Sequence, residues 1–237
     1  MHKIIPTEDG SITLFVPELN EHYHSVHGAI QESRHIFIQA GMEHFLSAYP
    51  EMISSGRPLH ILEAGFGTGL NAWLTLLEAD KLHLAVVYHS IEKYPLSKEE
   101  TSTLNYTEMI IDGEKTLFDA LHCSPWEMEQ SVTPNFTLCK HREDFRNIRF
   151  PAIFDLVYFD AFNPEVQPHL WTTEVFGHFY EALRPGGFLV TYCVKGIVKQ
   201  ALRSVGFTVK RLPGPPGKRE MLRATKPESA PGNPSGT

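Results

Sequence analysis

Residues 60–71 read His-Ile-Leu-Glu-Ala-Gly-Phe-Gly-Thr-Gly-Leu-Asn, and the expected fold follows from this stretch. An apolar run leads into an acidic residue and then into three glycines at alternate positions. After Leu70, the residues Ala72, Trp73 and Leu76 follow helical spacing. The pattern predicts a strand, a tight turn and the start of a helix. Because glycine lacks a Cβ atom, such a turn lets a ligand approach the backbone closely, although the glycines can also serve the turn alone.

The spacing of these glycines bears on the kind of ligand. Dinucleotide-binding units use G-x-G-x-x-G, whereas this chain has G-x-G-x-G with Glu63 two positions before the first glycine. That arrangement resembles motif I of the class I S-adenosylmethionine methyltransferases. Their ligand has no pyrophosphate, so acidic side chains are useful for its amino group and hydroxyls. The resemblance implies cofactor contacts from Glu63, Gly65, Phe66, Gly67, Thr68, Gly69 and Asn71.

Composition and length fit one sizeable α/β domain. The chain has 237 residues, of which 42% are hydrophobic and 21% charged, as in ordinary globular proteins. No stretch approaches the roughly 20 apolar residues of a membrane span, and the first residues lack a signal-peptide core. Three widely spaced cysteines fit a reducing compartment, so we expect a cytoplasmic protein. His22, His24 and His27 form the densest histidine group but lack ligand spacing, so we predict no metal.

Charge is unevenly distributed along the chain. The net charge of −7 argues against nonspecific coating of nucleic acid. From Lys195 to Lys226, however, Glu220 is the only acidic residue among many lysines and arginines. This segment is either a local contact for a phosphate backbone or a solvated surface, and charge alone does not separate the two.

The order of elements predicts a Rossmann-like, doubly wound sheet in residues 57–224, preceded by an N-terminal extension of residues 1–56 that covers the site. In the extension we expect a strand at 12–16, a loop at 20–28, a strand or helix start at 29–40, and a helix at 42–53. The later strands are expected at 82–91, 136–139, 154–159, 188–193 and 207–212, with a helix-rich, irregular region at 96–135. Residues 225–237 are predicted to be a flexible tail.

Polar residues follow several of these strands, where an open parallel sheet binds its ligands. Glu92 ends the second strand, 27 residues after Gly65, and is expected at the ribose hydroxyls. Lys93 beside it is also expected to contact the cofactor. Asp144 is placed near the adenine amino group, although Glu143 is an equally acidic neighbour. Asp160 ends the fourth strand and is expected in the same crevice, facing the cofactor and the substrate.

Four segments together carry a closer resemblance. They are residues 63–71, residues 90–96, residues 159–164 with Trp171, and the stretch Lys-Arg-Glu-Met-Leu at 218–222. Residues 23–40 add to them. The chain resembles the MnmC-like (MnmD) methyltransferases, which finish 5-methylaminomethyl-2-thiouridine at the tRNA wobble position. The family often has Gly where this chain has Ala161, a small departure that keeps Asp160.

The resemblance implies S-adenosyl-L-methionine as cofactor and the tRNA anticodon stem-loop as partner. It implies methyl transfer without the flavin oxidase domain of two-domain relatives, so a separate flavin enzyme would supply the amine. Asp160 would orient the amine or act as its base. Tyr23 and Phe162 would stack on the uracil, and Lys195, Lys218 and Arg219 would contact phosphates.

Three alternatives stay open at this point. The chain could methylate another amine, in a small molecule or a protein. It could be an NAD-dependent oxidoreductase, which the glycine spacing disfavours. It could be a binding module without catalysis, which Glu63, Glu92 and Asp160 argue against.

Overall fold

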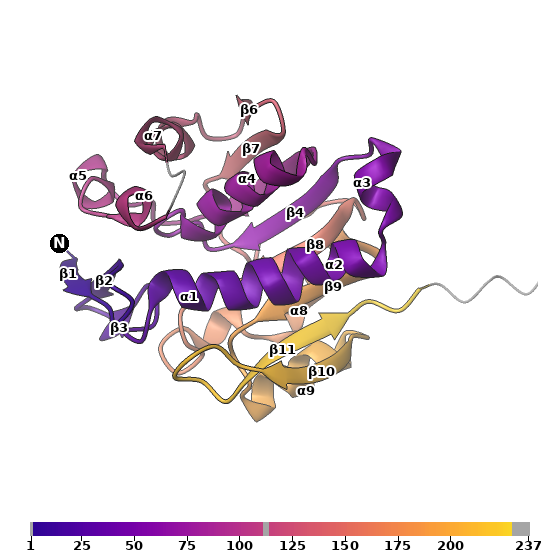
Figure 1. The fold of residues 1–237 in the computed structure, drawn as a ribbon. Coiled ribbons are helices and arrows are strands. Elements are labelled where there is room, and N and C mark those ends of the chain that lie inside the picture. Colours follow the sequence, from indigo (N-terminus) through magenta and orange to yellow (C-terminus); the bar gives the residue numbers. More distant parts are fainter. Residues whose placement is uncertain (1, 111–113, 229–237) are drawn as a thin grey trace, which may run out of the picture.

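A computed structural model describes residues 2–110 and 114–228. Its main sheet has eight strands (Figure 1). In spatial order they are β10 (Thr208–Pro213), β11 (Glu220–Thr225), β9 (Leu183–Thr191), β8 (Phe154–Phe159), β4 (Leu59–Ala64), β5 (Val86–Ile91), β7 (Phe136–His141) and β6 (Glu129–Thr133).

The five central strands, from β9 to β7, run parallel to one another. β11 runs antiparallel between β9 and β10, and β6 is an antiparallel strand at the far edge. The chain passes from β4 to β5 on one side and later returns to place β8 on the other side of β4. The strand order therefore reverses between β4 and β8, and ligands bind at such a switch point in open α/β sheets.

Helices cover both faces of this sheet (Figure 1). One face carries a continuous helix made of α1 (Ala29–Ser33), a π-helical segment (Arg34–Glu43) and α2 (His44–Ala48), together with α4 (Leu70–Leu82) and α7 (Lys115–Cys123). The other face carries α8 (Thr173–Ala182) and α9 (Gly196–Ser204).

The sequence of β8 explains this two-sided packing. All six of its residues are buried. Leu156 and Tyr158 face the first group of helices, while Val157 and Phe159 face the second. A strand covered on both faces has a continuous apolar sequence instead of an alternating one.

A small antiparallel sheet precedes the main one. It consists of β1 (Lys3–Pro6), β2 (Ile12–Val16) and β3 (Glu21–His22). The short helices α5 (Lys98–Thr101) and α6 (Tyr106–Met109) lie beside it in Figure 1. The side chain of Asn105 ties the two parts together, because it accepts from Ile12 N at 2.9 Å and donates to Gly10 O at 3.0 Å.

The doubly wound fold and the strand at 12–16 are confirmed, whereas several local predictions need correction. Residues 29–40 are helical throughout. The helix expected over 42–53 is interrupted, because Tyr49 precedes a proline and leaves the helical region at φ −129°, so that α3 (Glu51–Ser55) forms separately.

Two strands of the main sheet were not predicted, nor were β1 and β3 of the small sheet, of which β3 lies in the expected loop at 20–28. β6 falls within the expected helix-rich region, and β11 begins inside the stretch at 218–222 that was recognised only as a motif. β11 also continues to Thr225, which was predicted to be the first residue of the tail. Residues 229–237 of that predicted tail lie outside the described part of the chain. In the described part, no helix has both the length and the apolar character that crossing a membrane requires.

Candidate active site

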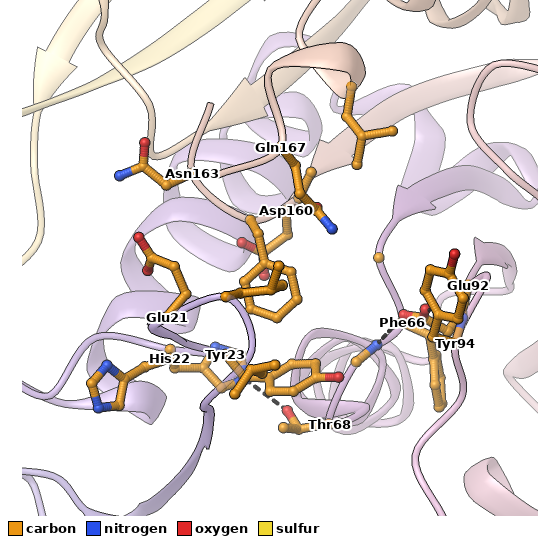
Figure 2. Close-up of a pocket in the computed structure, with 18 of the residues that line it drawn as sticks. Glu21, His22, Tyr23, Phe66, Thr68, Glu92, Tyr94, Asp160, Asn163 and Gln167 are labelled. Atoms are coloured by element: carbon orange, nitrogen blue, oxygen red, sulfur yellow. Dashed lines mark hydrogen bonds between the residues drawn. The ribbon is translucent and has the colours of Figure 1, made fainter. Parts of the chain in front are cut away.

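A cavity of about 900 Å³ opens at the carboxyl ends of the central parallel strands. Figure 2 shows Tyr23, Phe66, Glu92 and Asp160 around it. Of the residues predicted for the site, those on its wall are Tyr23, Gly65, Phe66, Gly67, Thr68, Asn71, Glu92, Lys93, Asp144, Asp160, Phe162 and Lys218. Segments from both ends of the sequence thus contribute to one cavity.

The glycine turn joins β4 to α4 with the backbone conformation that its sequence predicts. Gly65, Gly67 and Gly69 have φ values of +96°, +48° and +74°, which side chains with a Cβ rarely adopt. A Cβ atom on Gly65 would lie 2.8 Å from the carbonyl oxygen of Asp160, so the turn also needs glycine for close packing against the loop after β8. Gly69 lies off the cavity wall, beside His122, whose Nε2 is 3.1 Å from Thr68 O.

Glu92 lies directly beside this turn. Its carboxylate accepts hydrogen bonds from Gly67 N at 3.1 Å and from Tyr94 N at 2.7 Å. Burial raises its pKa, and these backbone donors act against that rise. The carboxylate is therefore fixed in position at the end of β5, with further lone pairs free to accept hydrogen bonds from ligand hydroxyls.

Glu63 occupies a different position from the one expected. It is fully buried behind the cavity wall and accepts a hydrogen bond from Ser90 Oγ at 2.6 Å. Burial raises its pKa to about 8. A direct contact between Glu63 and a bound ligand is not supported by this position, and its role toward the turn would be indirect.

Asp144 is on the wall but is already engaged by cations. Arg146 donates to both of its oxygens, at 2.9 and 2.7 Å, and Lys93 Nζ lies 2.8 Å from one of them. These hydrogen bonds, with Arg146 first, hold the pKa of Asp144 well below its usual range. The neighbouring Phe145 is buried and supplies an apolar surface beside it.

Asp160 faces the cavity from the loop after β8. Asn71 Nδ2 donates to its Oδ2 at 2.8 Å, and its backbone N donates to Ala64 O at 3.0 Å. Burial and the negative charge of Glu32 raise the pKa of Asp160 to about 7, against the effects of Asn71 and Lys218. The group can therefore exchange a proton near neutral pH.

The loop that carries Asp160 is fixed by two hydrogen bonds to its carbonyl groups. Trp171 Nε1 donates to Phe162 O at 2.7 Å, and Tyr192 Oη donates to Ala161 O at 2.9 Å. Trp171 is buried, so its position in the sequence pattern has a structural explanation.

Two aromatic rings on the cavity wall contact each other. The ring centres of Tyr23 and Phe162 are 5.0 Å apart in an edge-to-face arrangement. Tyr23 lies over the glycine turn, since a Cβ on Gly67 would be 3.0 Å from its ring. His24 next to it forms a 2.7 Å hydrogen bond with Thr68 Oγ1, marked by a dashed line in Figure 2. The segment after β3 therefore covers the turn.

The three predicted cationic contacts have different surroundings. Lys218 lies within the cavity, where it pairs with Glu32 and sits 4.2 Å from the centre of the Tyr192 ring. Lys195 is off the wall and donates to Asn163 Oδ1 at 3.1 Å. Arg219 is exposed, just before β11.

Glu32 is one of the wall residues that the sequence analysis did not assign to the site. It is only 7% exposed, and its Oε2 accepts from Ser25 N at 2.8 Å. An acidic residue between apolar positions of a helix was the available indication, but its partner Lys218 is 186 residues away.

The strand order, with β11 antiparallel beside β9 and the ligand cavity at the β4–β8 switch point, defines the class I methyltransferase fold. A family model described as S-adenosyl-L-methionine-dependent methyltransferase matches residues 116–227. This match covers slightly less than half of the chain. Together with the fold, it supports an S-adenosyl-L-methionine-dependent methyltransferase with S-adenosyl-L-methionine as cofactor.

The curated relatives that the chain matches over most of its length are MnmC proteins. It is 29% identical over 232 residues to the tRNA 5-methylaminomethyl-2-thiouridine biosynthesis bifunctional protein MnmC of Polaromonas naphthalenivorans, which covers 91% of this chain and 34% of the relative. The protein of the same name from Cupriavidus necator is 29% identical over 223 residues, covering 89% of this chain and 32% of the relative. The chain thus spans about a third of the length of these relatives.

Solved structures agree on the fold. MnmC2 from Aquifex aeolicus superimposes with a TM-score of 0.73 at 24% identity, covering 98% of this chain and 72% of that one. Spermidine synthase from Thermotoga maritima superimposes with a TM-score of 0.51 at 16% identity, covering 91% of this chain and 68% of that one.

The cavity suits this cofactor. It combines a positive-φ glycine turn, a fixed carboxylate at the end of β5 and a buried phenylalanine after β7. These groups are appropriate for a sulfonium ligand with ribose hydroxyls and an adenine ring, and the G-x-G-x-G spacing of the turn differs from the G-x-G-x-x-G of dinucleotide-binding turns. The oxidoreductase alternative is therefore set aside.

Proposed function

We propose that the enzyme methylates the 5-aminomethyl group of uridine or 2-thiouridine at the tRNA wobble position, and that the 2-thiouridine substrate gives 5-methylaminomethyl-2-thiouridine. The observation that carries this proposal is the placement of Asp160, bonded to Asn71, in the same cavity as the Tyr23–Phe162 ring pair. A planar base stacked on one of these aromatic side chains, with its amine near the carboxylate, would fill these two parts. The names of the curated relatives support the same substrate class.

For the cofactor, we assign the hydroxyl contacts to Glu92 and the close backbone approach to the turn at Gly65–Gly67. Phe66, Thr68 and Asn71 complete this side of the wall, and Lys93 fixes Asp144 next to Phe145. Glu63 and Gly69 lie off the cavity wall and would help to hold the conformation of the turn without contacting the cofactor. The cofactor supplies an electrophilic methyl group on a sulfonium, so the protein's main task is alignment.

The amine must be uncharged when it attacks. Its nitrogen lone pair forms the new N–C bond while the C–S bond breaks, and the electron pair of that bond stays on sulfur. The proton lost from nitrogen goes to the carboxylate of Asp160, directly or through water. Because the pKa of Asp160 is raised to about 7, both the carboxylate and its protonated form are accessible near neutral pH.

For the RNA, we propose that exposed Arg219 and half-buried Lys195, which pairs with Glu165, contact phosphates. Lys218 would pair with Glu32 inside the cavity and contact the base. Charge reversal at Arg219 should then weaken tRNA binding and leave cofactor binding unchanged, whereas Lys81→Glu at the distal end of α4 should affect neither. Equal tRNA affinity of the Arg219 variant and the unmodified enzyme over a range of salt concentrations would exclude this contact.

A separate flavin enzyme as the source of the amine, and a cytoplasmic location with the tRNA, belong to the same proposal. The second candidate function is methylation of an amine in a small molecule or a protein. Nucleoside mass analysis separates the two. After reaction with tRNA that carries 5-aminomethyl-2-thiouridine, we expect that nucleoside to gain one methyl group. If 5-aminomethyl-2-thiouridine gains no methyl group while free amines or protein amines are methylated, the second candidate function is favoured.

A further inference from the structure

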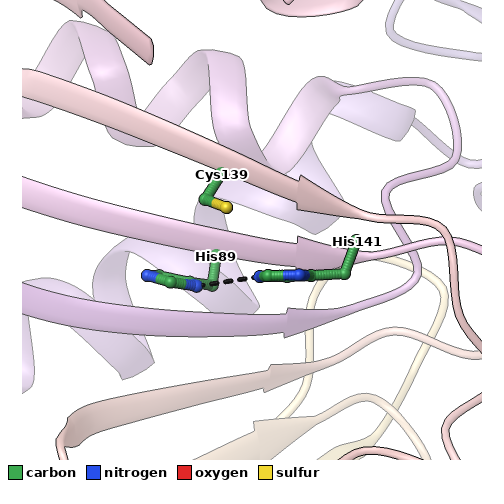
Figure 3. A group of neighbouring side chains, drawn as sticks. All are labelled: His89, Cys139 and His141. Carbon is green, nitrogen blue, oxygen red and sulfur yellow. Dashed lines mark hydrogen bonds between the residues drawn. The ribbon is translucent and has the colours of Figure 1, made fainter. Parts of the chain in front are cut away.

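A cluster of possible metal ligands lies apart from the cavity, where β5 and β7 pair. Figure 3 shows His89, Cys139 and His141. In the parallel register, His89 is opposite Cys139, and His141 follows two residues later on the same face of β7. One ligand atom from each of the three residues can be chosen so that all lie within 4.8 Å of one another. It is the only such three-residue group in residues 2–110 and 114–228.

The two imidazole rings face each other edge to edge. His89 Nδ1 and His141 Nε2 are 3.0 Å apart, the ring planes differ by 14°, and the ring centres are 5.2 Å apart. Two imidazoles on one tetrahedral Zn²⁺, with Zn–N bonds of about 2.0–2.1 Å, have ring centres roughly 5.2 Å apart. Tilting the rings in place would therefore admit an ion without moving either strand.

A carboxylate fixes the protonation of one of these rings. His141 Nδ1 donates to Glu127 Oε2 at 3.0 Å, which leaves the lone pair of Nε2 directed toward His89. Histidine ligands of metals commonly donate their other N–H to a carboxylate in this way.

The surroundings are apolar on one side and open on the other. The ring of Phe150 is centred 5.3 Å from that of His141, and Phe154 is 5.2 Å from His89. Cys139 is only 5% exposed, while the side chain of His141 keeps 18% of its surface and Glu127 is exposed. An ion would enter from the Glu127 side.

We propose that His89, Cys139 and His141 bind one Zn²⁺ ion through Nδ1, Sγ and Nε2, with water in the fourth position. Imidazole and thiolate are the ligands that Zn²⁺ prefers. Binding would release the thiol proton of Cys139 to solvent and move the Nδ1 proton of His89 to Nε2. The ion would join β5 and β7 three residues before Glu92 and Asp144, behind the cofactor side of the cavity. The site was not expected from the sequence and does not depend on the proposed tRNA substrate.

The experiment uses the full chain without a histidine tag, stripped with a chelator and titrated with Zn²⁺ against a chromophoric competitor. We expect one equivalent to bind. Titration with Co²⁺ should give the near-ultraviolet charge-transfer absorption of a cobalt–thiolate bond. Cys139→Ser should abolish that absorption and weaken Zn²⁺ binding at least tenfold, and Glu127→Gln should weaken it about tenfold.

Matched controls separate this site from other histidines and cysteines. Cys193 is also buried, and His27 belongs to the N-terminal histidine group, so Cys193→Ser and His27→Gln should leave both readouts unchanged. The proposal fails if stripped protein binds no Zn²⁺, or if Cys139→Ser and His141→Gln proteins, shown to be folded by circular dichroism, bind it as tightly as the unmodified chain. Exposed Glu127→Gln provides a test that does not risk the core.

Discussion

Replacement of Asp160 by Asn removes the proposed proton acceptor while keeping the shape of the side chain. The amide oxygen of the variant can still accept from Asn71 Nδ2, which now lies 2.8 Å from Oδ2. The loop should also keep its position, because Trp171 and Tyr192 hold the carbonyl groups of the next residues. The variant therefore isolates the loss of a titrating carboxylate.

The expected loss follows from the role of this group. A positioned general base contributes about 10²- to 10⁴-fold, so kcat should fall by that factor, equivalent to roughly 3–5 kcal/mol in the barrier. Cofactor affinity should change far less. In the unmodified enzyme, protonation of Asp160 should lower kcat/KM for tRNA about tenfold per pH unit below pH 7, in addition to the pH dependence of the amine, because the raised pKa leaves progressively less carboxylate.

The assay is methyl transfer from radiolabelled cofactor to tRNA between pH 5.5 and 9, with cofactor binding measured separately by calorimetry. The variant should lose the limb near pH 7 and keep only the pH dependence of the amine itself. Retention of full activity by Asp160→Asn would refute the catalytic role. A large loss of kcat with the limb near pH 7 intact would assign that limb to another group.

Three further predictions concern the groups around this carboxylate. Burial raises the pKa of Glu63 from the ordinary 4.5 to about 8. Ionisation of Glu63 should therefore destabilise the folded state as pH rises between these two values. The free energy of urea unfolding of Glu63→Gln, relative to that of the unmodified chain, should therefore increase from pH 5 to pH 8, on the order of 1.4 kcal/mol per unit of pKa shift. The same relative free energy at pH 5 and at pH 8 would disprove this. Glu92→Gln should weaken S-adenosyl-L-methionine binding roughly 10- to 100-fold in calorimetry, because charge-assisted hydrogen bonds are worth about 1.5–3 kcal/mol, and unchanged binding would remove the ribose assignment. Tyr23→Ala should raise KM for tRNA about 5- to 100-fold, since stacking on a base is worth about 1–3 kcal/mol, with cofactor affinity within a few-fold; an unchanged KM would place the base elsewhere.

The core of the fold was predictable because its determinants are local. The apolar run before Glu63, the alternating glycines and the start of α4 lie within 12 consecutive residues and specify a strand, turn and helix. The polar residues at the ends of β5 and β8 were placed by the general rule for parallel sheets, and both Glu92 and Asp160 reach the cavity.

The failures involve contacts between distant parts of the chain. Lys218 was assigned to phosphates because its sequence neighbours are basic, but its position is set by buried Glu32, 186 residues earlier. Glu63 was assigned to the ligand by motif, but strand register directs it toward Ser90. His89 lies 50 residues before Cys139 in the sequence, so the group of His89, Cys139 and His141 forms only when β5 pairs with β7.

The most direct test of the proposed function is transfer of a labelled methyl group from S-adenosyl-L-methionine to two otherwise identical tRNAs, one with 5-aminomethyl-2-thiouridine at the wobble position and one without the amine. We predict label on the first tRNA only, and its loss with Asp160→Asn. Label on both tRNAs, or on neither while the cofactor still binds, would contradict the proposed substrate.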